Sequence, residues 1–277
     1  MIRRRVALLC AAAIPLGACT TFTDNDSAAR VDDTVLTQSE FDLLANTAAG
    51  QPDAERVEVP FGVVQNVLNT WIVNQIVIGE IRAAGETPEP APPAEDALSE
   101  LIAEQETVFG QWVELPASTD EEFRDAYQRG PEFSEVACTA HVLVETRAEA
   151  DEVVAELEAG AAFADVARDR SIDSGSAQAG GALGCSVVGE FRQQFIPEFV
   201  EAALDAEVGV PTDPVESQFG YHVILVLPYD DIASLPEARA VFDSDGVRFR
   251  RAARAADIRI DPRFGAFDPE FGVVPLG

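Results

Sequence analysis

The residues best suited to chemistry lie in the segment 138–227. His141 and His222 are the only histidines in the chain, and each stands in an apolar run that is typical of a strand. Asp173 opens a glycine-rich stretch between them. Imidazole nitrogens and carboxylate oxygens ligate metals and form strong hydrogen bonds, so these three residues are the first candidates for a functional site.

Three common chemistries do not fit this pattern. A zinc site of the HExxH type is absent from the sequence, and a Ser-His-Asp hydrolase would need a nucleophile elbow that is also absent. The stretch Ser174–Gly184 lacks the GxGxxG spacing and the Lys-Ser/Thr that follows the glycines of a phosphate-binding loop. We therefore expect neither a metal ion nor a nucleotide cofactor.

A compact α+β unit would position these residues. The β-branched and apolar run Val136–Val144 predicts a central strand, and Val215 and His222–Leu227 supply the last strands. Ile172–Gly184 has four glycines and no periodicity, so it is predicted to be a long shaped loop. Helices are expected from the cap at Thr146 to Gly160, at Phe163–Arg170 and at Pro197–Ala206.

Five short motifs in this segment occur in the same order in a known family. They are Ala140–Val144, Ser171–Asp173, Gly180–Gly184, Pro197–Phe199 and Gln218–Ile224. Together they resemble the parvulin family of peptidyl-prolyl cis-trans isomerases. The resemblance implies a small antiparallel sheet surrounded by helices. It also implies an enzyme without a cofactor that acts on unfolded or proline-containing polypeptides.

The resemblance also implies roles for single residues. His141 and His222 match paired histidines on adjacent strands beneath the proline pocket, where we expect them to hydrogen-bond each other. Asp173 matches a position that is cysteine or aspartate among family members, and we expect it to polarise the surroundings of the imide. These three are the expected catalytic residues, although a purely structural task for both histidines is the alternative. The expected substrate-binding residues are Leu183, Phe195, Phe199 and Phe219.

Three features depart from the family pattern. The aspartate that is usual in the glycine motif is Ala182 here, and the stretch Cys185–Ile196 is longer than usual. Glu145 occupies a position that is basic in phosphate-directed parvulins, so like charge disfavours phosphoserine-proline substrates. The competing hypothesis is a catalytically weak or inactive parvulin-containing chaperone that binds unfolded exported proteins.

The N-terminus has the parts of an export signal. Arginines precede a short apolar run, Val6–Leu16, which is shorter than the ~20 residues of a membrane-spanning helix. Leu16–Cys19 resembles the lipobox of bacterial lipoproteins, whose cysteine becomes the first residue and carries lipid. We expect a lipoprotein signal peptide at 1–18, a lipid anchor on Cys19 at the outer face of the cell membrane, and a flexible tether at 19–30. A plain secretory signal is the alternative.

Cysteine usage agrees with export. Cys10 would leave with the signal and Cys19 would carry the lipid, so Cys138 and Cys185 remain. An even remainder in an oxidising compartment predicts one disulfide, and two buried thiols are the alternative.

The rest of the chain is predicted to be scaffold. Helices are expected at Ser39–Thr47, Val63–Ala84, Glu95–Phe109, Thr119–Gln128 and Pro236–Ala256, and a strand and turn at Val31–Thr37. Exported foldases of the SurA/PrsA type combine these parts. That resemblance implies a helical chaperone-like domain at 31–132, a parvulin domain at 133–229 and a segment, 230–277, that packs back on the helical domain.

The charge of the chain excludes some partners. The formal net charge is −30, and all 19 basic residues are arginine. Such a surface repels nucleic acid and anionic lipid headgroups. We therefore expect no nucleic-acid binding, and membrane contact through the lipid anchor only.

Overall fold

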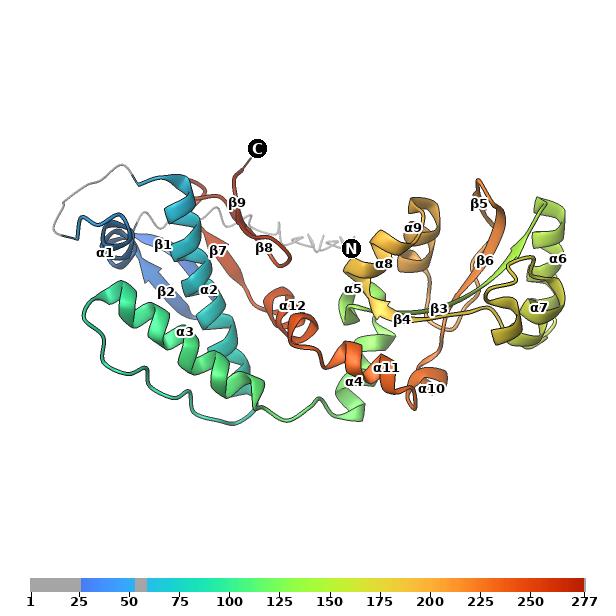
Figure 1. Ribbon diagram of the computed structural model, residues 1–277, viewed down its shortest axis with the longest axis horizontal. Coiled ribbons are helices and arrows are strands. Elements are labelled where there is room, and N and C mark those ends of the chain that lie inside the picture. The colour runs from blue at the N-terminus through green and yellow to red at the C-terminus, as the bar shows by residue number, and fades with distance from the viewer. Residues whose placement is uncertain (1–25, 53–58, 277) are drawn as a thin grey trace, which may run out of the picture.

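The computed structural model describes residues 26–52 and 59–276, which form two lobes joined by short helices (Figure 1). The expected signal peptide, the expected lipid anchor Cys19 and most of the predicted tether lie outside the described residues. The first lobe holds both ends of the described chain, and the second is built on strands between residues 136 and 226. The predicted α+β fold, with a C-terminal segment that packs back on the N-terminal region, is confirmed.

The first lobe contains a three-stranded antiparallel sheet in the order β2-β1-β7. β1 (Ser27–Val31) pairs with β2 (Thr34–Thr37) through a tight turn. On its other side it pairs with β7 (Ile258–Ile260), so residues from opposite ends of the chain share one sheet. A separate hairpin is formed by β8 (Ala266–Asp268) and β9 (Gly272–Val274). Its second strand packs on the long helix α2 (Phe61–Ala83).

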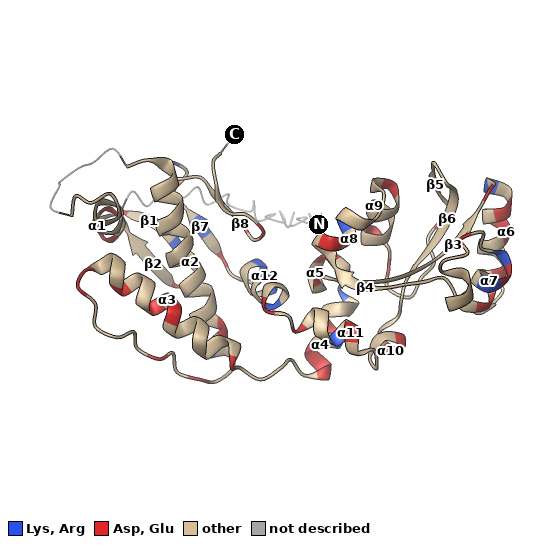
Figure 2. Cartoon of the chain, in the orientation of Figure 1, with Lys and Arg blue, Asp and Glu red and all other residues tan. Residues whose placement is uncertain are grey.

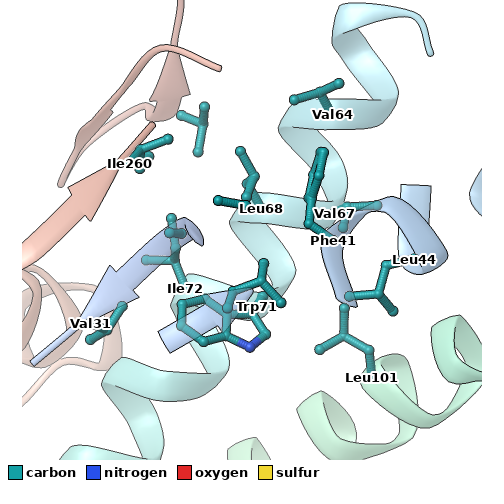
Figure 3. Packing of buried hydrophobic residues seen from close by; sticks show 14 of the residues in the cluster. Val31, Phe41, Leu44, Val64, Val67, Leu68, Trp71, Ile72, Leu101 and Ile260 are labelled. Carbon is teal, nitrogen blue, oxygen red and sulfur yellow. The ribbon is translucent and has the colours of Figure 1, made fainter. Parts of the chain in front are cut away.

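The helices of this lobe are α1 (Gln38–Ala48), α2 (Phe61–Ala83) and α3 (Ala97–Val113). α2 is central, because Leu68 and Ile72 are fully buried between the sheet and the other helices (Figure 3). By length and hydropathy α2 could cross a membrane. Half of that apolar window is buried inside the protein, so we assign it as a core helix.

Capping boxes determine where several helices begin. Thr37 accepts from the backbone of Glu40 at the start of α1, while the Glu40 carboxylate accepts from the Thr37 backbone. The same reciprocal pattern starts α4 (Asp120–Gln128) at Thr119 and α6 (Arg147–Glu158) at Thr146. These local hydrogen bonds satisfy N–H groups that a helix otherwise leaves without partners.

The second lobe is built on a four-stranded antiparallel sheet in the order β4-β3-β6-β5. One face packs on α6 and α7 (Phe163–Arg170), the other on α8 (Val188–Gln194) and α9 (Pro197–Asp205). The predicted central strand is β3, and the pairing of β3 with both β4 and β6 buries nearly all of it. The strands are β3 (Val136–Val144), β4 (Ala182–Val187), β5 (Val215–Ser217) and β6 (Gly220–Val226).

Short helices join the lobes around an aromatic cluster. Phe123 of α4 contacts the ring of Tyr127 on its own helix and the rings of Tyr229 and Phe242 from the later part of the chain. The remaining helices of the joint are α5 (Pro131–Ser134), α10 (Tyr229–Ile232), α11 (Pro236–Phe242) and α12 (Asp245–Ala255). This cluster gives the joint a core of its own.

The disulfide expected between Cys138 and Cys185 is present. The two residues are direct partners across β3 and β4. The bridge closes a sequence separation of 47 residues, and a loop of that length stabilises the fold by on the order of 4 kcal/mol in the chain-entropy model.

Four sequence predictions need correction. The tether does not extend to residue 30, because Ser27–Val31 form β1, and the expected strand and turn at Val31–Thr37 is the second half of a hairpin. The expected loop Ile172–Gly184 ends early, because residues 182–184 pair with β3 across a bulge. The helix expected over Pro236–Ala256 is two helices, α11 and α12.

The break between α11 and α12 has a local cause. Ser244 is extended at the start of α12, and its hydroxyl donates to the carbonyl of Val241 in the preceding helix. Serine and aspartate compete with helical hydrogen bonds in this way and favour helix ends. The two helices then diverge, since α11 packs on β4 and α12 packs on α2.

Candidate active site

A chain of hydrogen bonds crosses the face of the second sheet that is covered by α8 and α9. His141 on β3 and His222 on β6 are diagonal neighbours, and their Nδ1 atoms lie 3.1 Å apart. His141 Nε2 lies 2.8 Å from Oδ2 of Asp173. At the other end, His222 Nε2 lies 2.8 Å from the hydroxyl of Ser217. The structure thus brings together all three residues that were expected to be catalytic.

The carboxylate fixes where the protons lie in this chain. An ionised Asp173 only accepts, so His141 donates to it through Nε2–H. A neutral His141 then accepts at Nδ1, which requires His222 to donate through Nδ1–H. His222 Nε2 is left as an acceptor for the Ser217 hydroxyl. His141 Nε2 also lies 3.1 Å from the Ser176 hydroxyl, so every ring nitrogen has at least one hydrogen-bond partner.

The surroundings of Asp173 and His222 shift the pKa values of both groups downward. Hydrogen bonds from the Ser176 hydroxyl and from His141 lower the pKa of Asp173 to about 2. Burial, with the neighbouring His141 as a smaller cause, lowers the pKa of His222 to about 4. Asp173 is therefore charged and His222 neutral near pH 7.

Local backbone contacts place Asp173 beneath His141. The N–H of Ile172 donates to the carbonyl of Leu143 on β3 at 2.8 Å, which ties the start of the segment to the strand. The Asp173 carboxylate accepts from the N–H of Gly175 at 3.1 Å and from the Ser176 hydroxyl at 2.5 Å. The side chain is thus held on both oxygens, in a turn that begins with the residue itself.

Gly181 allows this segment to pass close to β3. Its φ is +81°, and its carbonyl accepts from the N–H of His141 at 2.9 Å. A Cβ at this position would lie 2.3 Å from the carbonyl oxygen of His141. Only glycine fits both the backbone angle and the space.

An apolar cluster lies over the two imidazoles. The Phe199 ring lies 5.7 Å from that of His141 and 5.4 Å from that of His222, edge to face with both. Phe195 stacks on Phe199 at 5.1 Å, and Leu183 of β4 packs in the same cluster. The expected substrate-binding residues Leu183, Phe195 and Phe199 are therefore adjacent.

Phe219 lies apart from this cluster. It occupies the turn between β5 and β6, and 59% of its surface is exposed. The long stretch Cys185–Ile196 contains α8, which was not predicted from the sequence, and Phe191 of α8 adds a third aromatic ring beside Phe195 and Phe199. This insertion thus builds one wall of the cluster.

Two serines of the hydrogen-bond chain were also missed. Ser176 and Ser217 bond to Asp173 and to His222, and each stands in a short polar stretch close to a glycine. Serine three residues after an aspartate is a turn signal that could have indicated the first. The second needed knowledge that β5 runs beside His222.

The arrangement suits binding rather than covalent chemistry. Both serine hydroxyls bond to members of the network, and an apolar cluster lies over polar side chains whose hydrogen bonds are satisfied. Among residues 26–52 and 59–276, no three His, Cys, Asp or Glu side chains are grouped as ligands of a metal ion would be. A site of this kind can enclose an apolar ring and remove water from a neighbouring polar group.

Comparison with known proteins identifies the class. Residues 121–227 match the family described as "Rotamase: PPIC-type PPIASE domain". The chain therefore carries a parvulin domain of the PpiC type. The match begins inside α4, ahead of the boundary expected at residue 133.

The relatives include proteins named foldase protein PrsA. That of Halalkalibacterium halodurans is 37% identical over 134 residues, which cover 48% of this chain and 38% of the relative. That of Caldanaerobacter subterraneus is 28% identical over 200 residues, 65% of this chain and 64% of the relative. The chain thus matches less than two thirds of the length of either relative.

Solved structures of parvulins and of PrsA are also similar to this chain. The parvulin of Nitrosopumilus maritimus is 33% identical and covers 34% of this chain and 96% of its own, with a TM-score of 0.31. PrsA of Bacillus subtilis is 21% identical and covers 84% of this chain and 90% of its own, with a TM-score of 0.33.

Proposed function

We propose that the protein is a peptidyl-prolyl cis-trans isomerase that assists the folding of exported proteins. The observation that carries the proposal is the Phe199 ring seated over both imidazoles of a satisfied hydrogen-bond network, within a parvulin domain. Its substrates are unfolded, proline-containing exported polypeptides.

The chemistry requires rotation and no bond cleavage. Resonance in the prolyl amide imposes a barrier of about 18–20 kcal/mol, and each 1.36 kcal/mol of selective stabilisation of the twisted amide gives about tenfold in rate. In the proposed mode the proline ring sits against Leu183, Phe195 and Phe199. Removal of water from the imide carbonyl then favours the twisted form, in which resonance places less charge on oxygen.

The proposed catalytic residues act on this carbonyl in different ways. His141 and His222 are buried and hydrogen-bonded to each other, so they form a rigid floor for the pocket. Asp173 adds a fixed negative charge. Beside the carbonyl oxygen, that charge raises the energy of the planar amide, whose resonance form is negative at oxygen.

An exchange assay on the chain from Thr20 onward tests the proposal. Acceleration of cis-trans exchange in a proline peptide is expected, and Phe199→Ala should reduce it by about tenfold or more through loss of about 1.4 kcal/mol. Phe61→Ala, an exposed aromatic in the other lobe, is the control and should leave the rate unchanged. Exchange at the uncatalysed rate would overturn the proposal.

The second candidate is a parvulin-containing chaperone that does not catalyse. Ala182 in place of the usual aspartate favours it, since this residue begins β4, directly before Leu183. Suppressed aggregation of an unfolded client without accelerated exchange would identify this function.

We further propose export and a lipid anchor. The disulfide supports an oxidising compartment, because such bonds are rare in the cytosol. The anchor rests on the Leu16–Cys19 motif alone. Cys19→Ser should release the protein from membranes, and retention of this variant would count against lipidation.

The proposed division of labour follows the lobes. Residues 31–132 with the returning segment 230–277 would bind client chains, and 133–229 would isomerise them. The pairing of β1 with β7 supports treating the two outer segments as one unit.

A further inference from the structure

A groove of about 550 Å³ lies in the first lobe and is lined by residues of β2, α1, α2 and α3. Part of its lining is apolar. Leu44 of α1, Trp71 of α2 and Leu101 of α3 converge there from three helices (Figure 3). Leu43 adds an exposed apolar side chain, with 47% of its surface accessible. A volume in the ~300–1,000 Å³ range can take a short peptide segment.

One wall of the groove is β2, which is an edge strand of its sheet. Thr34, Val35 and Leu36 of β2 line it, and among the described residues β2 pairs only with β1. The N–H of Thr37, at the end of the strand, donates to Glu40. An edge strand beside an apolar groove can add an extended polypeptide through backbone hydrogen bonds.

The groove is acidic. Glu40, Glu100 and Glu104 line it, and its lining contains no arginine. Figure 2 shows acidic residues along α3, where two of the three lie one turn apart. Hydrogen bonds from Thr37 lower the pKa of Glu40, which keeps that carboxylate charged.

Two of these carboxylates are available to a ligand in different ways. Glu104 accepts from the fully buried Asn74 of α2 at 3.0 Å, which orients it on α3. Glu100 is exposed and has no ion-pair partner among the described residues. The wall of the groove therefore offers one oriented and one exposed negative charge.

We propose that this groove binds an extended polypeptide segment in which apolar side chains are flanked by arginine or lysine. Apolar side chains would cover Trp71, Leu44 and Leu101, and the flanking cations would neutralise the carboxylates of α3. The proposal deepens the proposed foldase function, because it names the class of client segment that the first lobe selects. A second copy of this chain, with its net charge of −30, is disfavoured by repulsion.

The test uses two labelled peptides without proline, so that the isomerase site does not contribute. One contains leucine and phenylalanine flanked by arginine, and the other has glutamate in place of each arginine. Fluorescence anisotropy on the chain from Thr20 onward gives the affinities. Emission from Trp71 reports occupancy, because this residue lines the groove whereas Trp112 is 1% exposed in another cluster.

Matched substitutions on α3 locate the binding. Glu100→Gln with Glu104→Gln should lower the affinity for the arginine peptide by about two- to thirtyfold, since each exposed ion pair contributes a factor of about 1.4 to 5 to the affinity. Glu106→Gln, an exposed residue of the same helix outside the groove, should change nothing. Glu40 is left intact because it caps α1.

The outcomes separate this proposal from the proposed function. Tighter binding of the arginine peptide, weakened by salt and by the double substitution, supports the groove. Equal affinity for both peptides, or equal effects of the groove and control substitutions, overturns it. Proline-peptide exchange, measured in parallel, should be the same in the wild-type chain and in both variants. Absence of exchange activity in the wild-type chain would overturn the isomerase and leave the groove standing.

Discussion

At the scale of residues, the site is a row of side chains joined by hydrogen bonds, with a donor and an acceptor defined at each link. Ser217, His222, His141 and Asp173 are linked end to end, and Ser176 holds the last of them. Such networks are costly when one member is left without a partner in a buried setting. Changes at the charged end should therefore act on the whole row.

Asp173→Asn tests that dependence. The amide removes the negative charge and offers one acceptor oxygen to three donors, which are His141, Ser176 and the N–H of Gly175. We expect catalysed proline exchange to fall by about tenfold or more, equivalent to about 1.4 kcal/mol. Asp169→Asn, an exposed change on α7, is the control. Equal rates in both variants would remove Asp173 from the site.

His222 predicts an acid-sensitive stability. In the unfolded chain it takes up a proton near its ordinary pKa of 6.5, but in the folded protein only near 4. Between these values the unfolded state binds more protons, so stability falls as the pH is lowered through that window and levels off below it. Asp173, whose pKa is lowered from 3.8 to about 2, extends the loss over that lower range.

Urea unfolding at pH 7 and pH 5 measures the effect of His222. The wild-type chain should lose more stability between the two values than His222→Asn, which has no titrating ring. A parallel loss in both proteins would mean that other groups cause the pH dependence. His141 and Asp173 face His222 most closely and are retained in both.

At the scale of elements, the site depends on the passage of residues 172–181 beneath β3. Ile172 and Gly181 both bond to the backbone of this strand, at either end of the segment. β4 then continues beside β3 and is joined to it by the Cys138–Cys185 disulfide. The segment from Ile172 into the start of β4, called the strap below, therefore brings Asp173 and Leu183 to the site from its two ends.

Gly181→Ala should disturb this strap. The added Cβ would meet the carbonyl oxygen of His141, and φ of +81° disfavours any side chain. We expect loss of more than about 1 kcal/mol of stability together with reduced proline exchange. Gly184→Ala is the comparison, because its φ is +85° but a Cβ on Gly184 would have no other atom within 4 Å. If both variants behave alike, the backbone angle alone matters and close approach does not.

Local signals explain which elements the sequence predicts well. Thr37 with Glu40 and Thr146 with Glu149 start their helices through bonds within four residues. The motif residues around His141 and His222 likewise fall on strands that pair as expected. By contrast, residues 182–184 become a strand only because β3 lies beside them, and β7 exists only because β1 is its partner. Such long-range pairing leaves no periodic trace in a short segment.

At the scale of the whole molecule, α12 is the electrostatic link between the lobes. It carries four arginines within 11 residues. Arg250 and Arg254 form ion pairs with Glu135, which is 2% exposed and begins the path into β3 with φ of +63°. On its other side, α12 packs on α2. One helix thus holds both lobes in their relative positions.

Arg250→Ala with Arg254→Ala should destabilise the chain by about 3–5 kcal/mol, because it leaves a buried carboxylate without a partner. Adding Glu135→Gln should recover much of that loss, since the uncompensated charge is removed. The exposed pair Arg192 and Glu132 is the control, and its removal should cost at most about 1 kcal/mol. If the effects of Glu135→Gln and of the two arginine substitutions on thermal stability simply add, the ion pairs between Glu135 and α12 do not join the lobes.

The pairing of β1 with β7 determines when the molecule can finish folding. β1 is among the first described residues to be synthesised, yet its partner strand comes after residue 257. The four strands of the second lobe are all complete by residue 226. A sheet cannot form before its last strand has been synthesised, so the sheet of the second lobe can form before the sheet of the first lobe. We therefore expect the sheet of the middle segment to form first and the pairing of β1 with β7 to form last.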